Sequence, residues 1–314
     1  MSQIKPEKLR GLQLVTGEKG GVGKSLFTMC LLEYCLEKKL PYRFYDADRS
    51  SPDVGLIYEP NKYSAMLNGK TDQGKAIAKK GSKATVKDET YQPQNKSVEQ
   101  LVEPNNLHIF FSEDEEDGFL ANHLIAEAAE HLVIVNLPAQ VEMIIHQWLI
   151  GRGILEVAQL DELPITFWFV TDGSPESLDL LFNSLTIYGQ GVNHVVVINE
   201  GLSKRAKENF QAHRVCKMIE QQSIPIVTLP ELWLSNEEKV KLKTQRKRLG
   251  EAADRKSSND FTFVVKSQIF RFIRQAIQEI ESSGVFSDAH ELSNNQSNDN
   301  KEMIQPQTFD AITI

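Results

Sequence analysis

Short runs of apolar residues alternate along this chain with longer stretches whose apolar residues recur at helical spacing. The short runs predict strands at residues 12–16, 42–46, 107–111, 132–135, 165–170, 194–198 and 224–228. The longer stretches predict helices at residues 24–38, 119–130, 175–188, 204–221 and 265–281. Alternation of this kind is typical of α/β proteins. We therefore expect a single doubly wound, mainly parallel sheet, which would bind a ligand at the carboxyl ends of its strands.

Two segments break this alternation. Residues 61–105 are polar, contain eight lysines and have almost no periodic apolar pattern, which predicts a flexible insertion. Residues 284–314 are rich in Asn, Gln, Ser and Asp, which predicts a disordered tail. The expected organisation is one domain over residues 1–283 followed by that tail.

The glycine-rich segment after the first predicted strand indicates an anion site. It reads Lys-Gly-Gly-Val-Gly-Lys-Ser over residues 19–25 and is followed directly by the first predicted helix. Glycines let successive backbone N–H groups converge on a phosphate, and the helix dipole adds partial positive charge. The candidate nucleotide contacts are Lys19, Gly20, Gly21, Val22, Gly23, Lys24, Ser25 and Leu26. A glycine-rich turn carrying two surface lysines is the alternative.

Two residues of this segment have expected roles in phosphate chemistry. Lys24 would neutralise the β- and γ-phosphates, and the Ser25 hydroxyl would ligate Mg²⁺. The standard pattern G-x-x-x-x-G-K-[ST] is not met, because Glu18 occupies the position of its first glycine. We interpret the segment as a nucleotide-binding loop in a fold of the P-loop NTPase type.

The loop resembles that of the deviant Walker A ATPases of the ParA/MinD family, which reads K-G-G-x-G-K-[ST]. The resemblance is strong over the loop, moderate over the next two motifs and weak after about residue 200. It implies ATP and Mg²⁺ as cofactors and a homodimer that forms on ATP binding. It also implies that Lys19 reaches across that dimer to the phosphates of the other subunit.

The second motif places two carboxylates just past the predicted strand 42–46. The resemblance implies that Asp48 positions or activates the attacking water and that Asp46 lies nearer the metal. Hydrolysis needs a carboxylate that orients water in line with the γ-phosphate, which suits this pair. A pair of loop-capping aspartates is the alternative.

The third motif follows the predicted strand 132–135. Family members usually have Asp and a later Gly where this chain has Asn136 and Gln140. Asn136 can still hydrogen-bond a water on Mg²⁺, but it lacks the charge that helps to hold the cation. Gln140 replaces a freely turning glycine whose N–H can meet the γ-phosphate. Both departures predict slow hydrolysis, and neither removes the phosphate cradle.

Two further strand ends face the expected nucleotide. Asn199 matches the family asparagine that recognises adenine, and an amide pairs well with the donor and acceptor edge of adenine, which favours ATP over GTP. A strand-terminal turn asparagine is the alternative. Residues 171–176 read as a helix entry with an N-cap, which we interpret as structural.

Charge adds one candidate surface. The chain has 35 basic and 43 acidic residues, a net charge of −8, so any nucleic-acid site must be local. The densest basic cluster consists of Lys239, Lys241, Lys243, Arg246, Lys247 and Arg248. ParA-type proteins bind DNA nonspecifically through basic residues, which makes this cluster a candidate DNA surface. A solvated helical face is the alternative.

The remaining features bear on the compartment and the membrane. Cys30, Cys35 and Cys216 form no C-x-x-C pair, and the start of the sequence has no apolar signal segment, so we expect a reduced cytoplasm. The apolar stripe within residues 269–280 fits either a final core helix or an amphipathic membrane helix of the MinD kind. We favour the core helix and expect no membrane binding.

We thus expect an ATP-dependent dimerisation switch with slow ATPase activity. The resemblance implies a role in plasmid or DNA partition, in conjugal transfer (a TraL-like branch), or in intracellular positioning, with a stimulating protein partner. Two alternatives remain open, a nucleotide-bound scaffold with little or no hydrolysis and a membrane-positioning ATPase.

Overall fold

A computed structural model describes residues 9–64, 109, 111 and 115–287, except 259. Its centre is a sheet of six strands in the order β2-β3-β1-β4-β5-β6, and every neighbouring pair is parallel. The strands are β1 (Gly11–Thr16), β2 (Tyr42–Asp46), β3 (Leu132–Asn136), β4 (Ile165–Thr171), β5 (Asn193–Asn199) and β6 (Ile226–Leu229). The sheet confirms the predicted doubly wound α/β fold of the P-loop NTPase type.

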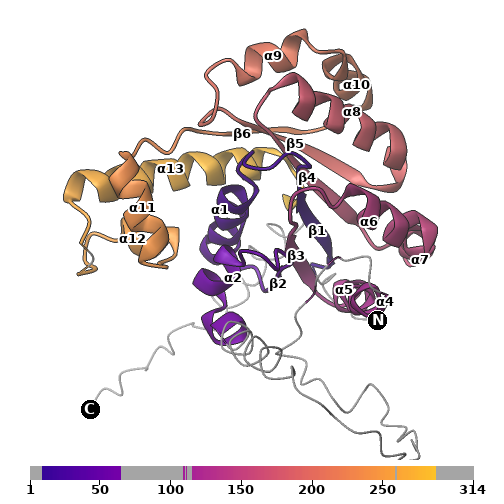
Figure 1. Cartoon of the computed structure of the whole chain (residues 1–314), viewed down its shortest axis with the longest axis horizontal. Helices are drawn as coiled ribbons and strands as arrows, with labels where there is room; N and C mark the ends of the chain where they lie inside the picture. Colours follow the sequence, from indigo (N-terminus) through magenta and orange to yellow (C-terminus); the bar gives the residue numbers. More distant parts are fainter. Residues whose placement is uncertain (1–8, 65–108, 110, 112–114, 259, 288–314) are drawn as a thin grey trace, which may run out of the picture.

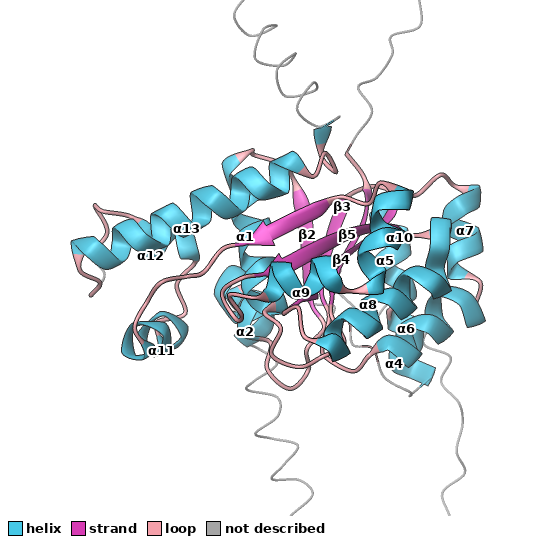
Figure 2. Cartoon of the chain, turned by 90° about the horizontal axis from the view of Figure 1, so that it is seen from above, coloured by secondary structure: helices cyan, strands magenta, loops and turns pink. Residues whose placement is uncertain are grey.

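Helices cover both faces of this sheet (Figure 1), which explains why its strands are nearly continuous apolar runs. Figure 2 shows α1 and α13 on one side and α5, α8 and α10 on the other. The first side carries α1 (Lys24–Glu37), α2 (Asp53–Tyr58), α12 (Leu249–Ala253) and α13 (Phe263–Ser282). The second carries α4 (Glu115–Leu120), α5 (Asn122–Ala128), α6 (Glu142–His146), α7 (Ile154–Leu160), α8 (Pro175–Tyr188), α9 (Ala206–Ala212) and α10 (Arg214–Gln222).

Three further elements lie outside these two groups of helices. A π-helical turn, Gln147–Gly151, joins α6 to α7, and a 3₁₀ turn, Gly189–Gly191, follows α8. The helix α11 (Asn236–Thr244) stands apart from the sheet beside α12 (Figure 1).

The strand register brings the loops of the expected site to one edge of the sheet. Asn136 at the end of β3 pairs with Val15 of β1 and with Asp46 of β2. The carboxyl ends of these three strands therefore lie in one row, and β4 continues the row on the other side of β1.

Several predicted elements differ in their bounds. The helix expected over residues 204–221 is divided into α9 and α10, because His213 is extended (φ −86°, ψ 147°) and its ring accepts a hydrogen bond from the Val215 N–H. The helix expected over residues 119–130 is likewise divided into α4 and α5. Of the strand expected at 107–111, only Ile109 and Phe111 are described, and both are buried outside any strand.

The predicted insertion begins later than residue 61. Residues 61–64 are helical, and the Tyr63 ring is fully buried. Its hydroxyl accepts a 2.5 Å hydrogen bond from the backbone N–H of Asp46. The Lys62 ammonium lies 3.7 Å from the centre of the Tyr45 ring and donates to the Phe44 carbonyl. An aromatic residue and a long lysine stem thus anchor a segment that composition alone marked as flexible; residues 65–105 lie outside the described residues.

The predicted tail also begins too early. Phe286 is buried, with its ring centre 5.3 Å from that of Tyr34 and 6.0 Å from that of Trp168. One aromatic side chain therefore extends the folded domain past residue 284, and residues 288–314 lie outside the described part of the chain.

The final helix belongs to the core, as predicted. The apolar stripe of α13 is buried against α1, α12 and β6. Among the described helices, none has both the length and the apolar content needed to cross a membrane.

Candidate functional site

The loop between β1 and α1 has the conformation of an anion cradle. Gly21 and Gly23 have φ values of 81° and 102°, and Gly23 is the N-cap of α1. A side chain on Gly17 would meet the Val170 carbonyl oxygen at 2.6 Å. No atom lies within 4 Å of the positions that a Cβ would take on Gly20 or Gly21, so the space in front of the loop is open. Backbone N–H groups at the start of α1 can therefore meet a phosphate there.

Lys24 lies inside this loop, as the motif predicted. Its ammonium donates a 2.6 Å hydrogen bond to the Gly17 carbonyl, and only 8% of the residue is exposed. Burial lowers the pKa of Lys24, and the nearby carboxylates of Glu18 and Asp48 oppose that shift. Ser25 follows in the first turn of α1, half-buried at the edge of an adjacent cavity.

Glu18 replaces the first glycine of the standard pattern and has a structural role that the sequence did not reveal. Its carboxylate accepts a 3.0 Å hydrogen bond from the N–H of Glu142, and its carbonyl accepts from the N–H of Gln140. Burial raises the pKa of Glu18. The residue thus ties the glycine-rich loop to the connection between β3 and α6. Gln140 itself has φ 59°, so it keeps the left-handed conformation that favours glycine.

Lys19 binds a turn of its own subunit. Its ammonium lies 2.8 Å from a carboxylate oxygen of Asp172 and donates a 3.0 Å hydrogen bond to the Ser174 hydroxyl. The hydrogen bond to Asp172 raises the pKa of Lys19. Burial would raise the pKa of Asp172, but hydrogen bonds from Lys19 and Ser174 outweigh it and leave that pKa lowered. Residues 171–176 are therefore more than the helix entry that we expected, although Ser174 does cap α8.

Asp46 and Asn136 are joined by a hydrogen bond, and their role toward a metal stays a prediction. The Asn136 amide nitrogen donates to Asp46 over 2.9 Å, and its oxygen accepts from the Thr28 hydroxyl over 3.0 Å. Asp46 also accepts from the Gly55 N–H. Burial raises the pKa of Asp46 to about 6, against the hydrogen bonds from Asn136 and Gly55. Thr28 lies one turn after Ser25 on α1, and that spacing is the signal by which sequence reasoning could have found it.

The Asp48 carboxylate caps the turn that leads to α2. It accepts hydrogen bonds from the Ser50 N–H, the Ser50 hydroxyl and the Ser51 N–H, at 3.0, 2.5 and 3.1 Å. These are the contacts of the loop-capping alternative, so the role of Asp48 toward an attacking water stays a prediction.

Asn199 at the end of β5 is hydrogen-bonded to the glycine-rich loop. Its amide nitrogen donates to the Val22 carbonyl over 2.8 Å, and its oxygen accepts from the Gly201 N–H over 3.0 Å. A side chain on Gly23 would lie 2.3 Å from that amide nitrogen, so the glycine permits the contact. Both polar atoms of Asn199 serve the backbone here, and adenine recognition by this residue stays a prediction.

A cavity of about 420 Å³ opens beside the loop. Ser25, Leu26 and Asn199 lie at its border with the loop, and most of its wall is apolar. Residues of α1, α2, the loops after β5 and β6, α11, the turn after α11 and the start of α12 complete it: Met29, Asp53, Ile57, Gly201, Leu202, Pro230, Leu232, Lys239, Leu242, Lys243, Lys247 and Leu249. Its size and composition suit a small organic ligand.

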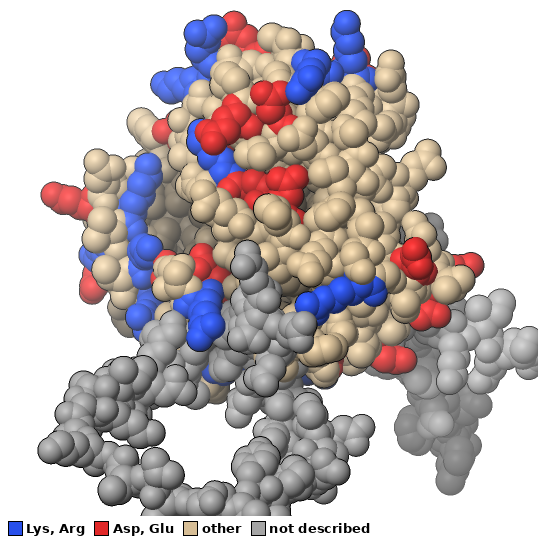
Figure 3. Space-filling model, turned by 45° about the vertical axis from the view of Figure 1, so that its right-hand side comes forward, with Lys and Arg blue, Asp and Glu red and all other residues tan. Residues whose placement is uncertain are grey.

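The six basic residues at 239–248 differ in their contacts, and DNA binding by this cluster stays a prediction. Lys239, Lys243 and Lys247 line the cavity. Lys241 donates to the Asp260 carbonyl over 2.6 Å, and Arg248 pairs with Glu251 over 2.9 Å. On the face drawn in Figure 3, some Lys and Arg side chains form a row at the left, and others lie beside acidic side chains.

Within the described ranges, no three His, Cys, Asp or Glu side chains converge as a metal centre. Cys30 and Cys35 are buried free thiols in α1, as expected for packing residues.

Comparison with known proteins identifies no family for the chain. No protein-family model matches it. A segment of 59 residues is 36% identical to Protein MobD of Acidithiobacillus ferrooxidans, and this alignment spans 19% of the chain and about a quarter (26%) of that protein. A nucleotide-binding protein from Archaeoglobus fulgidus, solved in complex with ADP and with Co, is 16% identical over 76% of this chain and 88% of its own, with a TM-score of 0.40.

Proposed function

We propose that this chain binds ATP with Mg²⁺ at the loop of residues 17–25. The observation that carries the proposal is the placement of Lys24. Its ammonium is buried within an open glycine-rich loop, at the N-terminus of α1 and at the carboxyl edge of a parallel sheet. A phosphate entering this loop meets backbone N–H groups, the helix dipole and one fixed cation.

Different residues contact the phosphates and the cation. Lys24 exchanges the Gly17 carbonyl for oxygens of the β- and γ-phosphates, since a charged acceptor offers the stronger hydrogen bond. The Ser25 hydroxyl would hold Mg²⁺, with Asp46 and Asn136 as its expected contacts through water. When bound, the cation neutralises charge on the phosphates.

Hydrolysis at this site is slow. Asp48 would orient the attacking water, yet its carboxylate already accepts hydrogen bonds from Ser50 and Ser51. Asn136 contributes no charge, and its oxygen accepts from Thr28. Catalysis of phosphoryl transfer depends on positioning and charge stabilisation, and both are incomplete here.

The nucleotide acts as a dimerisation switch. In this step Lys19 leaves Asp172 and reaches the γ-phosphate bound by a second subunit. The resemblance of the loop to ParA/MinD ATPases supports this step and suggests a role in partition, conjugal transfer or positioning. The contacts of Asp48 and Asn136 favour a second candidate, a nucleotide-bound scaffold with little hydrolysis.

Sedimentation with a slowly hydrolysed ATP analogue tests the switch. The wild type should sediment as a dimer with the analogue and as a monomer without it, and Lys19→Ala should remain monomeric. A wild type that never dimerises would overturn the switch and leave binding to be tested separately. Phosphate release by the wild type separates the switch from the scaffold.

A further inference from the structure

The helix α11 (Asn236–Thr244) covers the cavity without being part of the hydrophobic core. It begins with a complete capping box, in which Ser235 and Glu238 bond each other's backbone N–H groups, and none of its side chains is fully buried. Leu242 is partly buried against the core and Val240 is exposed, so α11 gains little stability from packing. Its inner side instead contributes Lys239, Leu242 and Lys243 to the cavity wall.

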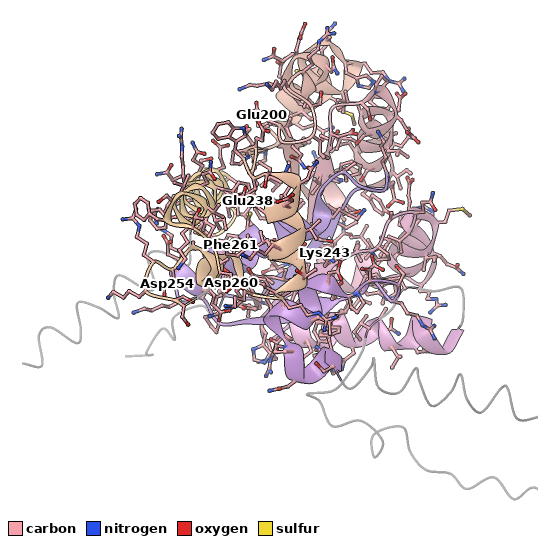
Figure 4. The ribbon with its side chains drawn as sticks, turned by 60° about the vertical axis from the view of Figure 1, so that its left-hand side comes forward. Glu200, Glu238, Lys243, Asp254, Asp260 and Phe261 are labelled. Atoms are coloured by element: carbon pink, nitrogen blue, oxygen red, sulfur yellow. The ribbon has the colours of Figure 1, made fainter. Side chains whose placement is uncertain are left out.

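The lysines that line the cavity are separated from the other basic residues by their contacts. Lys239, Lys243 and Lys247 recur every four residues, so those within the helix lie on the same side of α11. Lys241 instead donates to the carbonyl of Asp260. In Figure 4, Lys243 lies on one side of α11, while Asp260 and Phe261 lie on the other.

The cavity lysines face one carboxylate. The Lys243 ammonium lies 2.8 Å from Asp53, which stands at the start of α2 in the segment that follows Asp48. Their side chains are 69% and 33% exposed, so this ion pair stands at the rim and contributes little to stability. A pair that contributes little to the fold is free to exchange partners with a ligand.

The donors and acceptors at the rim suit the nucleoside half of a nucleotide. Asn199 has both amide atoms bonded to backbone, so other residues must supply the polar contacts of the cavity. Lysine ammonium groups only donate, and they match ribose oxygens and the ring nitrogens of a purine. The Asp53 carboxylate only accepts, and it matches a ribose hydroxyl or an exocyclic amino group. The apolar wall of the cavity can cover the faces of the base.

We propose that α11 is the cover of the nucleotide pocket, and that Lys239, Lys243, Lys247 and Asp53 bind the ribose and base of the nucleotide whose phosphates lie on the 17–25 loop. This inference rests on the proposed nucleotide site and reassigns half of the basic cluster from DNA to that site. It also joins α11 to the loop after β2 through the bound nucleoside.

Two double variants with equal loss of charge test the assignment. Lys239→Ala with Lys243→Ala removes two cavity lysines, and Lys241→Ala with Arg246→Ala removes two charges from the same segment outside the cavity. Calorimetry measures the affinity for Mg·ATP and for inorganic tripolyphosphate. Because tripolyphosphate lacks a nucleoside, the comparison separates binding of the phosphates from binding of the nucleoside. The cavity variant should lose about tenfold or more in ATP affinity and less than about threefold in tripolyphosphate affinity, because two charged hydrogen bonds to the nucleoside are gone. The control variant should bind both ligands within about threefold of the wild type.

Other results would overturn either this assignment or the proposed nucleotide site itself. Unchanged ATP affinity in the cavity variant overturns the assignment, as does an equal loss for both ligands in both variants, which would indicate only long-range charge. If the loop binds phosphate, Lys24→Ala should lower the affinity for both ligands. If the wild type binds neither ligand, the proposed function itself fails, and this inference fails with it. Tripolyphosphate binding by the cavity variant also shows that the variant is folded.

Discussion

The Lys19 ammonium lies 2.8 Å from the Asp172 carboxylate, which joins the glycine-rich loop after β1 to the turn that begins α8. In the proposed dimer the same ammonium serves the phosphates of the other subunit. The two contacts exclude each other, so Asp172 competes with the partner's nucleotide for Lys19. The strength of this pair would then set how readily the proposed dimer forms.

Asp172→Asn should therefore favour dimerisation. The substitution keeps the size of the side chain and removes the charge that holds Lys19, so dimers should form with a slowly hydrolysed ATP analogue at a several-fold lower protein concentration. Sedimentation over a concentration series measures the shift. Asp179→Asn is the matched control, because Asp179 pairs with Arg214 on α10, away from the loop. An Asp172→Asn protein that dimerises less readily than the wild type would contradict the competition.

Asn136→Asp should destabilise the protein at neutral pH. It would place a second carboxylate beside the buried Asp46, where Asn136 now donates a 2.9 Å hydrogen bond. Two like charges at that distance raise each other's pKa, and the cost should be roughly 1–3 kcal/mol in the free energy of unfolding at pH 7. The cost should shrink near pH 5, where the pair shares a proton. Urea denaturation at both pH values measures it, with Asn193→Asp at an exposed position of β5 as the control. Equal losses at both pH values would show that packing, not charge, is responsible.

His194 should make stability depend on pH. The ring is buried, with Nδ1 3.1 Å from the Val192 carbonyl and Nε2 3.1 Å from the Ser184 hydroxyl, so the neutral ring donates through Nδ1 and accepts through Nε2. Burial lowers the pKa of His194 from its ordinary 6.5 to about 4. Between these values the unfolded chain binds more protons than the folded one, so stability falls as the pH falls from 6.5 toward 4, by up to about 3 kcal/mol.

His194→Gln is the comparison that isolates this contribution. The difference in unfolding free energy between wild type and variant should diminish over the same pH range, because the variant has no proton to gain at this position. Denaturant titrations at several pH values from 4 to 7 measure it. A constant difference would mean that His194 is protonated at the same pH in both states.

The sequence predicted the sheet well, because buried parallel strands are continuous apolar runs that require no knowledge of the partner strand. The predicted boundaries of the insertion and of the tail were wrong, because in each case a single buried aromatic residue extends the folded domain. Tyr63 and Phe286 lie in polar surroundings in the sequence, and only the tertiary structure supplies the core against which each packs. The short helices α6 and α12 were missed because five residues are too few to show helical periodicity.

Lys24 and the glycines lie together in one loop, because they are neighbours in the sequence, and their role toward a nucleotide stays a prediction. The partners of the other site residues come from distant parts of the chain. Asp172 meets Lys19 from 153 positions away, and Asn199 meets Val22 from 177. Pairings of this kind follow from the strand order β3-β1-β4-β5, which the sequence did not specify. The sequence identified Lys239, Lys243 and Lys247 only as members of a basic cluster, because their spacing of four does not say which side of α11 faces the cavity.

Calorimetric titration of Mg·ATP into the wild type and into Lys24→Ala tests the nucleotide site most directly. The wild type should bind, and Lys24→Ala should lose at least about tenfold in affinity, or ~1.4 kcal/mol, because the cation at the β- and γ-phosphates is gone. Lys241→Ala is the matched control outside the loop and should bind as the wild type does. Equal affinities in the wild type and Lys24→Ala, or no binding by a folded wild type, would contradict the assignment of this loop to nucleotide.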